Sequence, residues 1–165
     1  MLFRSEEDDA LRGTLASYAA IYLTDHHVSQ AASRVLADWV QKGGQLFATA
    51  GAGMLDEFNQ PNATLRALFG VQPPALNIST NPMVLFEKTD LPFCAPLDEV
   101  ALKTGGAVPV FAAQGKFTAS GGEVLGTFKD GSPAVVARAH GTGRAIYCGF
   151  LPALSYFQPA LPKRP

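Results

Sequence analysis

Tyr18-Ala19-Ala20-Ile21-Tyr22-Leu23 and Gln45-Leu46-Phe47-Ala48-Thr49 are the two stretches that decide the fold. Both are short apolar runs without polar alternation, a pattern typical of strands that are covered on both faces in a parallel sheet. Residues 28–42 lie between them and place apolar side chains at three- and four-residue spacings, which predicts an amphipathic helix. A strand, a helix and a strand within about 30 residues indicate a right-handed βαβ unit.

The predicted helix has clear start and stop signals. Ser29 is a suitable N-cap, and Gly43-Gly44 can supply a left-handed exit at its end. A shorter helix is predicted at residues 62–70, with Asn62 as its cap and Gly70 as its stop. The apolar stripe of the first helix comprises Val28, Ala32, Val35, Leu36, Trp39 and Val40. This stripe favours core packing of the single tryptophan over a role in stacking on sugars.

The C-terminal third predicts an antiparallel meander. Strands are expected at residues 123–128, 133–138 and 144–150, and the Asp130-Gly131 pair predicts a tight turn between the first two. By contrast, residues 71–109 hold closely spaced prolines and are interpreted as an irregular insertion. Short strands are expected there only around 84–86 and 108–112. A short helix is predicted at residues 5–16.

The composition bounds the class of protein. The 165 residues fit a single domain over residues 1–165, with 16% charged residues against a typical value of about 25%. The net charge of −1 argues against a partner that is a nucleic acid or an anionic membrane. A low charge count on a small protein indicates that part of its surface is covered by a partner.

The compartment signals are few. No apolar run reaches the ~20 residues that a membrane helix needs, and the acidic N-terminus has no secretory apolar region. The sequence therefore predicts a soluble chain without a signal peptide of its own, in a compartment that the sequence does not specify. Cys94 and Cys148 could form one disulfide or remain buried free thiols, of which the second is the commoner state in apolar surroundings.

Several motifs resemble those of a known family. The order of the strand at 18–23, the helix ending Trp39-Val40-Gln41-Lys42-Gly43-Gly44 and the strand at 45–49 is similar to the glutamine-amidotransferase-like domain of β-galactosidases, called their trimerisation domain. Leu65-Arg66-Ala67-Leu68-Phe69-Gly70-Val71 resembles the next family motif. Gly131-Ser132-Pro133-Ala134 and Gly141-Thr142-Gly143-Arg144 resemble the motifs at its far end.

The resemblance implies an α/β fold of the flavodoxin-like type. This fold is a three-layer sandwich with a parallel core sheet, here followed by the antiparallel meander. Such domains open with a strand and a helix ahead of the strand at 18–23, and residues 1–17 have room only for a short helix. We therefore expect the first strand to be missing and the chain to be part of a larger protein.

The resemblance also specifies what catalysis would require. A glutamine amidotransferase places a cysteine on the turn after the strand at 45–49 and activates it with a His-x-Glu pair. Here the turn reads Ala48-Thr49-Ala50-Gly51-Ala52-Gly53, without a thiol, and His140 is followed by Gly141-Thr142. The catalytic triad is absent, so we predict no catalytic residues and no cofactor.

One group of residues is a candidate ligand site. Polar and glycine residues follow both predicted parallel strands and should meet at the carboxyl edge of the sheet, where open α/β folds bind ligands. They are Asp25, His26, His27, Gly51, Gly53, Asp56 and Glu57. Imidazoles and carboxylates can hold Zn²⁺, but adjacent histidines usually point apart and no spaced His pattern occurs, so no metal site is assigned. The alternatives are solvated loop residues and a tight glycine turn.

The sequence favours a non-catalytic, amidotransferase-like accessory domain for oligomerisation or interdomain packing in a carbohydrate-active protein. Its expected partners are other domains of a parent chain or identical subunits, with a carbohydrate as a further candidate. If the parent is an enzyme, a glycoside hydrolase such as a β-galactosidase is expected. The alternative is a ligand-binding, metal-binding or hydrolytic module at the carboxyl edge of the sheet. Uncovered surface is expected near the N-terminal edge of the sheet and around residues 150–160, which include Phe150, Tyr156 and Phe157.

Overall fold

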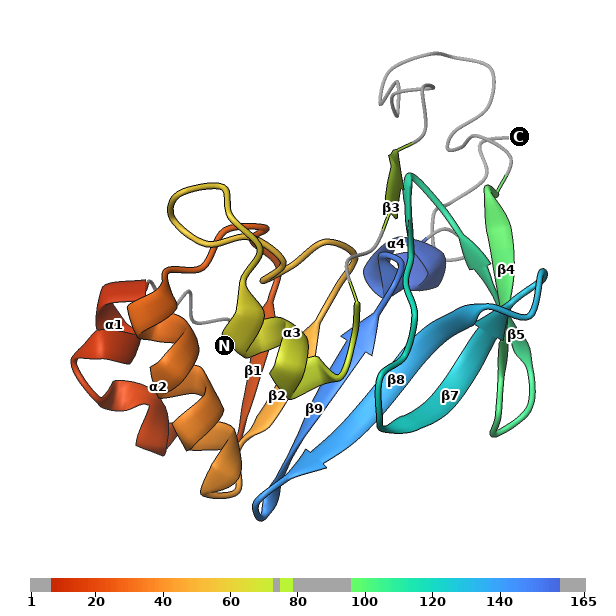
Figure 1. The fold of residues 1–165 in the computed structure, drawn as a ribbon. Coiled ribbons are helices and arrows are strands. Elements are labelled where there is room, and N and C mark those ends of the chain that lie inside the picture. Colours follow the sequence, from red (N-terminus) through yellow and green to blue (C-terminus); the bar gives the residue numbers. More distant parts are fainter. Residues whose placement is uncertain (1–6, 73–74, 79–95, 158–165) are drawn as a thin grey trace, which may run out of the picture.

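The computed structural model describes residues 7–72, 75–78 and 96–157 (Figure 1). A seven-stranded sheet in the order β1-β2-β9-β8-β7-β4-β5 forms its centre. The strands of this sheet are β1 (Ala20–Leu23), β2 (Gln45–Ala48), β4 (Asp98–Leu102), β5 (Ala107–Val110), β7 (Glu123–Phe128), β8 (Pro133–His140) and β9 (Gly143–Cys148). A separate antiparallel pair joins β3 (Ala75–Ile78) to β6 (Ala113–Lys116).

The predicted βαβ unit is confirmed. β1 and β2 pair in parallel, with Tyr22 opposite Phe47, and α2 (Gln30–Gln41) connects them. Ser29 caps α2, since its hydroxyl accepts a hydrogen bond from the backbone N–H of Ala32 at 3.1 Å. Gly43 follows the helix with φ 117°, a conformation that a glycine adopts without steric cost.

The remaining helices are short. They are α1 (Glu7–Leu11), a 3₁₀ turn η1 (Thr14–Ser17), α3 (Ala63–Phe69) and α4 (Pro152–Phe157). Asn62 caps α3 and Gly70 ends it in the left-handed region with φ 68°, as predicted. The expected helix at residues 5–16 is divided between α1 and η1, because the left-handed Gly13, with φ 82°, separates them.

The sheet corrects the predicted flavodoxin-like sandwich. Only β1, β2 and β9 run in parallel, and the pairs from β9 through β8, β7 and β4 to β5 are antiparallel. The sheet curls into a half-barrel (Figure 1). The reason is that the described residues contain one βαβ unit, whereas the consecutive pairs β4–β5, β7–β8 and β8–β9 are antiparallel hairpins. The predicted meander of β7, β8 and β9 is confirmed.

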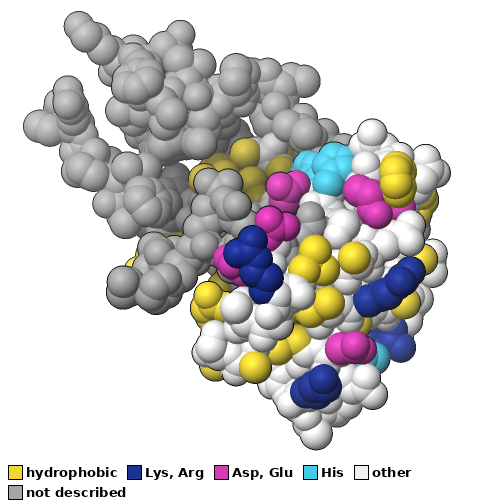
Figure 2. Space-filling model, turned by 90° about the vertical axis from the view of Figure 1, so that its left-hand side faces the viewer, with side chains coloured by type: hydrophobic (Ala, Val, Ile, Leu, Met, Phe, Trp, Pro, Cys, Tyr) yellow, Lys and Arg dark blue, Asp and Glu magenta, His cyan; other side chains and the backbone are white. Residues whose placement is uncertain are grey.

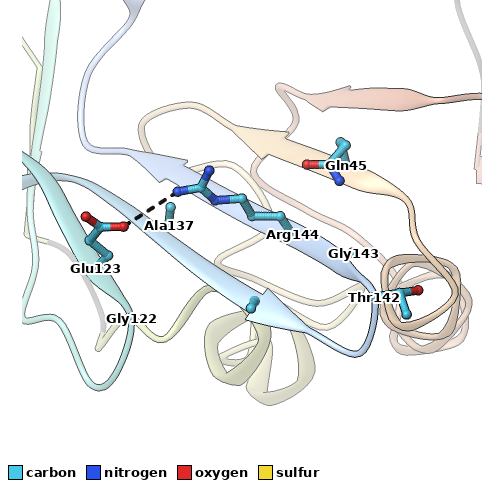
Figure 3. A pocket seen from close by; sticks show the side chains of 8 residues that line it. Gln45, Gly122, Glu123, Ala137, Thr142, Gly143 and Arg144 are labelled. Atoms are coloured by element: carbon cyan, nitrogen blue, oxygen red, sulfur yellow. Dashed lines mark ion pairs between the residues drawn. The ribbon is translucent and has the colours of Figure 1, made fainter. Parts of the chain in front are cut away.

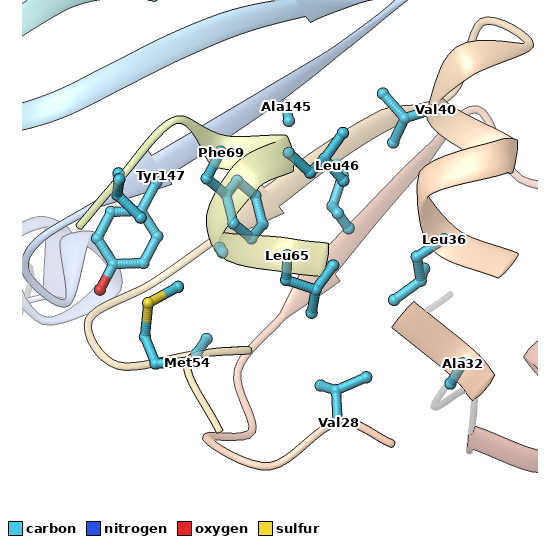
Figure 4. Packing of buried hydrophobic residues seen from close by; sticks show 14 of the residues in the cluster. Val28, Ala32, Leu36, Val40, Leu46, Met54, Leu65, Phe69, Ala145 and Tyr147 are labelled. Atoms are coloured by element: carbon cyan, nitrogen blue, oxygen red, sulfur yellow. The ribbon is translucent and has the colours of Figure 1, made fainter. Parts of the chain in front are cut away.

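Helices α1, α2 and α3 contribute to one hydrophobic cluster on one face of the sheet (Figure 4). The helices supply Ala32, Leu36, Trp39, Val40, Leu65, Leu68 and Phe69 to it. The sheet supplies Leu46 and Ala48 from β2, and Ala145 and Tyr147 from β9. Trp39 is buried as expected, with 8% of its surface exposed. The amphipathic stripe of α2 therefore covers the parallel part of the sheet.

A second cluster fills the inside of the half-barrel on the other face. It comprises Val100, Val110, Phe128, Ala134, Val135, Cys148 and Phe150, with Phe47, Leu125 and Ile146 among the half-buried residues at its margin. Side chains alternate between the faces along a strand. Ile146 and Cys148 therefore point away from the helices, whereas Ala145 and Tyr147 point toward them.

Two further predictions need correction. Residues 71–109 contain two strands that the sequence did not predict, β3 and β4, whereas β5 lies where the strand around 108–112 was predicted. The tail contains α4, and Phe150 is 3% exposed in the second cluster rather than available to a neighbouring domain. Tyr156 is 80% exposed, in agreement with the prediction for that segment.

Cys148 is a buried free thiol. Cys94 and the strand expected at 84–86 lie outside the described residues.

Candidate functional site

The candidate ligand residues do meet at the carboxyl ends of β1 and β2. The loop that follows β2 packs on the start of α2, and two hydrogen bonds join them. The backbone N–H of Gln30 donates to Glu57 Oε2 at 2.9 Å, and Gln30 Nε2 donates to Asp56 Oδ2 at 3.0 Å. Glu57 thus satisfies one of the free N–H groups at the helix start, where a negative charge is favoured.

Asp56 organises this loop from within. It is 2% exposed, and its Oδ1 accepts the backbone N–H groups of Phe58 at 2.9 Å and Gln60 at 2.8 Å. The hydrogen bond from Gln30, followed by these backbone donors, holds the pKa of Asp56 below its ordinary value of 3.8. The carboxylate is therefore charged at neutral pH and its oxygens are occupied by the protein itself.

The residues after β1 also make local contacts. Asp25 Oδ1 accepts the backbone N–H of His27 at 3.1 Å, which closes a short turn. His27 Nε2 lies 2.7 Å from Asn59 Oδ1, which joins the two loops. The ring of His26 lies over Gly51, since a Cβ at that position would lie 2.8 Å from His26 Nε2. Gly51, with φ 80°, is required both by the turn and by this close approach.

The turn after β2, residues 49–53, has no thiol. The backbone N–H of Gly51 donates to the buried hydroxyl of Tyr147, and Gly53 donates to the carbonyl of Asp25 at 2.8 Å. The glycines therefore serve a tight turn. Within residues 7–72, 75–78 and 96–157, no group of three or more His, Cys, Asp or Glu residues is arranged to hold a metal. The side chain of Asp25 closes a turn within its own loop, whereas those of His27, Asp56 and Glu57 join the loops to each other and to the start of α2.

A second surface of interest lies on the sheet itself. Tyr22 on β1 stands opposite Phe47 on β2, and Phe47 stands opposite Ile146 on β9. The rings of Tyr22 and Phe47 lie 5.3 Å apart at 53°. Tyr22 is 72% exposed, although it lies on a strand parallel to its neighbour. This apolar row is on the face away from α2, and the described residues leave it partly uncovered.

A groove continues this surface toward the start of β9 (Figure 3). It encloses about 620 Å³ and is open to solvent, with Gln45, Glu123, Ala137, Ala139 and Arg144 among its lining residues. Ala137 stands opposite Ile146, and Ala139 stands opposite Arg144. The groove and the apolar row therefore share one face. We call the residues Tyr22, Gln45, Phe47, Glu123, Ala137, Ala139, Arg144 and Ile146 the open sheet face.

Charges of both signs border the open sheet face. Glu123 Oε1 lies 2.6 Å from Lys103 Nζ, and Glu123 Oε2 lies 3.9 Å from Arg144 Nη2 (Figure 3). The hydrogen bond from Lys103 is the main cause that lowers the pKa of Glu123 below its ordinary value of 4.5. On the side of the molecule shown in Figure 2, basic and acidic side chains are likewise mixed with hydrophobic ones. That side therefore shows no continuous basic surface for a nucleic acid.

Sequence reasoning did not single out the open sheet face by its residues, because its apolar members were assigned to a sheet covered on both faces. Gln45 and Arg144 are polar and stand opposite each other on this face, but Phe47 and Ile146, two positions further along each strand, are apolar. The sequence therefore lacks the polar alternation that indicates one uncovered face. No helix among the described residues is long and apolar enough to cross a membrane.

Several solved β-galactosidases contain a domain with a similar fold. A β-galactosidase from Bacillus circulans sp. alkalophilus superposes with a TM-score of 0.70 at 16% identity over 90% of this chain and 22% of its own. A β-galactosidase from the haloarchaeon Halorubrum lacusprofundi gives 0.67 at 21% identity over 92% and 25%. A GH42 β-galactosidase mutant from G. stearothermophilus gives 0.65 at 20% identity over 87% and 21%. These likenesses show the fold.

The chain thus spans about a quarter or less of the length of these solved proteins. No curated protein sequence gives a significant match. The family model described as the β-galactosidase trimerisation domain matches residues 14–161, which includes the βαβ unit, both clusters and the meander. The chain therefore belongs to the β-galactosidase trimerisation domain family.

Proposed function

We propose that this chain is a non-catalytic accessory domain through which identical copies, or domains of one parent protein, associate. The match to a trimerisation domain family over residues 14–161 carries the proposal. The turn after β2 supports it, because Gly51 and Ala52 stand where an amidotransferase needs a thiol and the neighbouring polar groups join loops. A trimerisation domain acts by burying surface, so none of this chemistry is required.

The parent protein is proposed to be carbohydrate-active, and a glycoside hydrolase of the β-galactosidase type is the favoured activity. The support is the family description together with the solved β-galactosidases that share the fold. We propose that the acids of hydrolysis, and any carbohydrate bound, belong to other parts of that parent. The amidotransferase-like character is proposed for the β1–α2–β2 unit, which carries the first of the motifs in the resemblance.

The oligomeric state of the 165-residue chain tests the proposal. Size-exclusion chromatography with light scattering, run over a dilution series, should give an associated species whose fraction falls on dilution. A chain that remains monomeric at every concentration would contradict association between copies. Assay with a chromogenic β-galactoside should give no turnover, and hydrolysis by the purified chain would contradict the non-catalytic assignment.

Ligand binding by Asp25, His26, His27, Gly51, Gly53, Asp56 and Glu57 stays a prediction. Thermal unfolding with and without divalent cations or simple sugars checks it, because a ligand that binds the folded state raises the Tm. His26→Ala is the suitable variant, since the imidazole of His26 can be removed without breaking a hydrogen bond that holds the loop.

A further inference from the structure

The parallel part of the sheet is covered on one face only. Strands in a parallel arrangement are normally buried on both faces. Here α2 and α3 cover the face that carries Leu46 and Tyr147. The opposite face carries Tyr22, Phe47 and Ile146, and the described residues leave Tyr22 72% exposed there. Tyr22 and the half-buried Phe47 and Ile146 form a contiguous apolar row, and such a row, unlike a single exposed ring, is typical of an interaction surface.

The open sheet face has the make-up of an interface. Its centre is aromatic and aliphatic, and its border is polar, with Gln45, Glu123 and Arg144. Protein interfaces combine an apolar centre with a polar rim, and Tyr and Arg are enriched among the residues that contribute most to binding. Ala137 and Ala139 keep the groove shallow, so that a flat surface can approach the sheet closely.

The charges on this face suit a second copy of the same chain. Glu123 lies between Lys103 and Arg144, so the border carries both signs within a few ångströms. Such a surface can approach another copy, whose net charge is −1, without strong repulsion. Five strands at ~4.8 Å spacing make the face roughly 20 Å wide. A face of that width is large enough to form the central part of a standard interface. Such an interface, including its rim, buries ~800 Å² on each partner.

We infer that the open sheet face is the surface through which one copy of this chain binds another. The inference rests on the proposed function, because it names the contact surface for the association proposed there. In a ring of three copies the contact is heterologous, so this face on one copy meets a different surface of the next. Removing the apolar centre of the face should therefore dissociate the ring.

Tyr22→Lys tests the inference, with Phe58→Lys as the matched control. Phe58 is 70% exposed, close to the 72% of Tyr22, and lies on the loop that packs against the start of α2. Both substitutions exchange an exposed aromatic ring for a charge, so neither buries a charge in the fold. Sedimentation equilibrium should show that Tyr22→Lys weakens association on the order of 30-fold, and that Phe58→Lys leaves it unchanged.

Ala139→Glu provides a second, independent variant. Ala139 is exposed and stands opposite Arg144, so the new carboxylate gains a partner within the fold while it fills the groove. It should also dissociate the copies while the thermal unfolding midpoint is kept. Association that survives both Tyr22→Lys and Ala139→Glu overturns the inference and leaves the proposed function standing. Equal dissociation by Phe58→Lys overturns it too. A wild-type chain that is monomeric throughout overturns the inference together with the association between identical copies on which it rests.

Discussion

The backbone N–H of Gly51 donates a hydrogen bond of 3.0 Å to the hydroxyl of Tyr147, a residue 96 positions later in the chain. Both residues are buried, and burial raises the pKa of Tyr147 to about 12. The phenol is therefore neutral at every physiological pH. This bond fixes the turn after β2 to the strand β9 beside it.

Tyr147→Phe should destabilise the fold by about 1–3 kcal/mol, because it leaves a buried N–H group without an acceptor. The free energy of unfolding, measured by urea titration, checks this. Tyr156→Phe is the control, since Tyr156 is 80% exposed and its change should stay within ~0.5 kcal/mol. Equal stability of the two variants would show that the bond contributes nothing.

Asn62→Ala should cost more than Ser29→Ala, although both residues cap helices. Asn62 Oδ1 accepts the N–H of Leu65 at 3.1 Å, and its Nδ2 donates to the carbonyl of Val28 at 2.9 Å and to Ser33 Oγ at 2.7 Å. Loss of a cap costs ~1 kcal/mol, and the unpaired buried acceptors add about 1–3 kcal/mol. Urea unfolding of the two variants gives the order, and a larger loss for Ser29→Ala would contradict the assigned network.

Asp56 should make stability depend on pH in the acid range. Its pKa is lowered in the folded state by the hydrogen bond from Gln30 and then by the N–H groups of Gln60 and Phe58. The unfolded chain therefore binds its proton first as the pH falls. The stabilisation is complete above the ordinary value of 3.8 and is lost as the pH falls through the lower folded value.

The urea midpoint of the wild-type chain should consequently fall as the pH is lowered past 3.8, and Asp56→Asn should flatten part of that fall. Glu123 and Asp130 contribute in the same direction, because ion pairs with Lys103 and Lys116 lower their pKa values. The variant therefore reduces the slope without removing it. An unchanged slope in Asp56→Asn would contradict the assignment.

Cys148 should be unreactive in the folded chain. Burial raises the pKa of its thiol to about 12, so the reactive thiolate is scarce and the sulfur is inaccessible. Peptide-resolved mass spectrometry after treatment with iodoacetamide should find Cys148 unmodified in buffer and modified in urea. Rapid modification in buffer would show that the second cluster opens readily.

The local rules predicted the helical half of the molecule well. Ser29, Asn62 and Gly70 stand at the helix ends where capping preferences placed them, because caps depend on interactions within a few residues. The apolar stripe of α2 was also predicted correctly, and Trp39, which lies on it, is buried. The loops around His27 and Asp56 meet as expected, since both follow strands of one parallel pair.

The sheet order was beyond these rules. β9 lies between β2 and β8, and nothing local to residues 143–148 specifies that its partner on one side is β2, in the first third of the chain. The closely spaced prolines predicted an irregular segment where β4 lies. Pro109 itself lies in β5 at the edge of the sheet, where a strand residue can lack a backbone N–H donor. The open sheet face was predicted only as uncovered surface near the N-terminal edge of the sheet, and its residues were not identified, because both parallel strands were expected to be covered on both faces.

The central place of β9 has a consequence for how this chain reaches its native state. β2 pairs with its second neighbour only when β9, the last strand in the sequence, has been added to the sheet. The β2–β9 pairing joins the helical half of the molecule to the meander. Contacts between segments so distant along the chain have a high entropic cost of closure, and topologies rich in them fold slowly. Until that pairing forms, the edge of β2 and the apolar side chains of both clusters are exposed to self-association, the hazard that non-local sheets carry during synthesis.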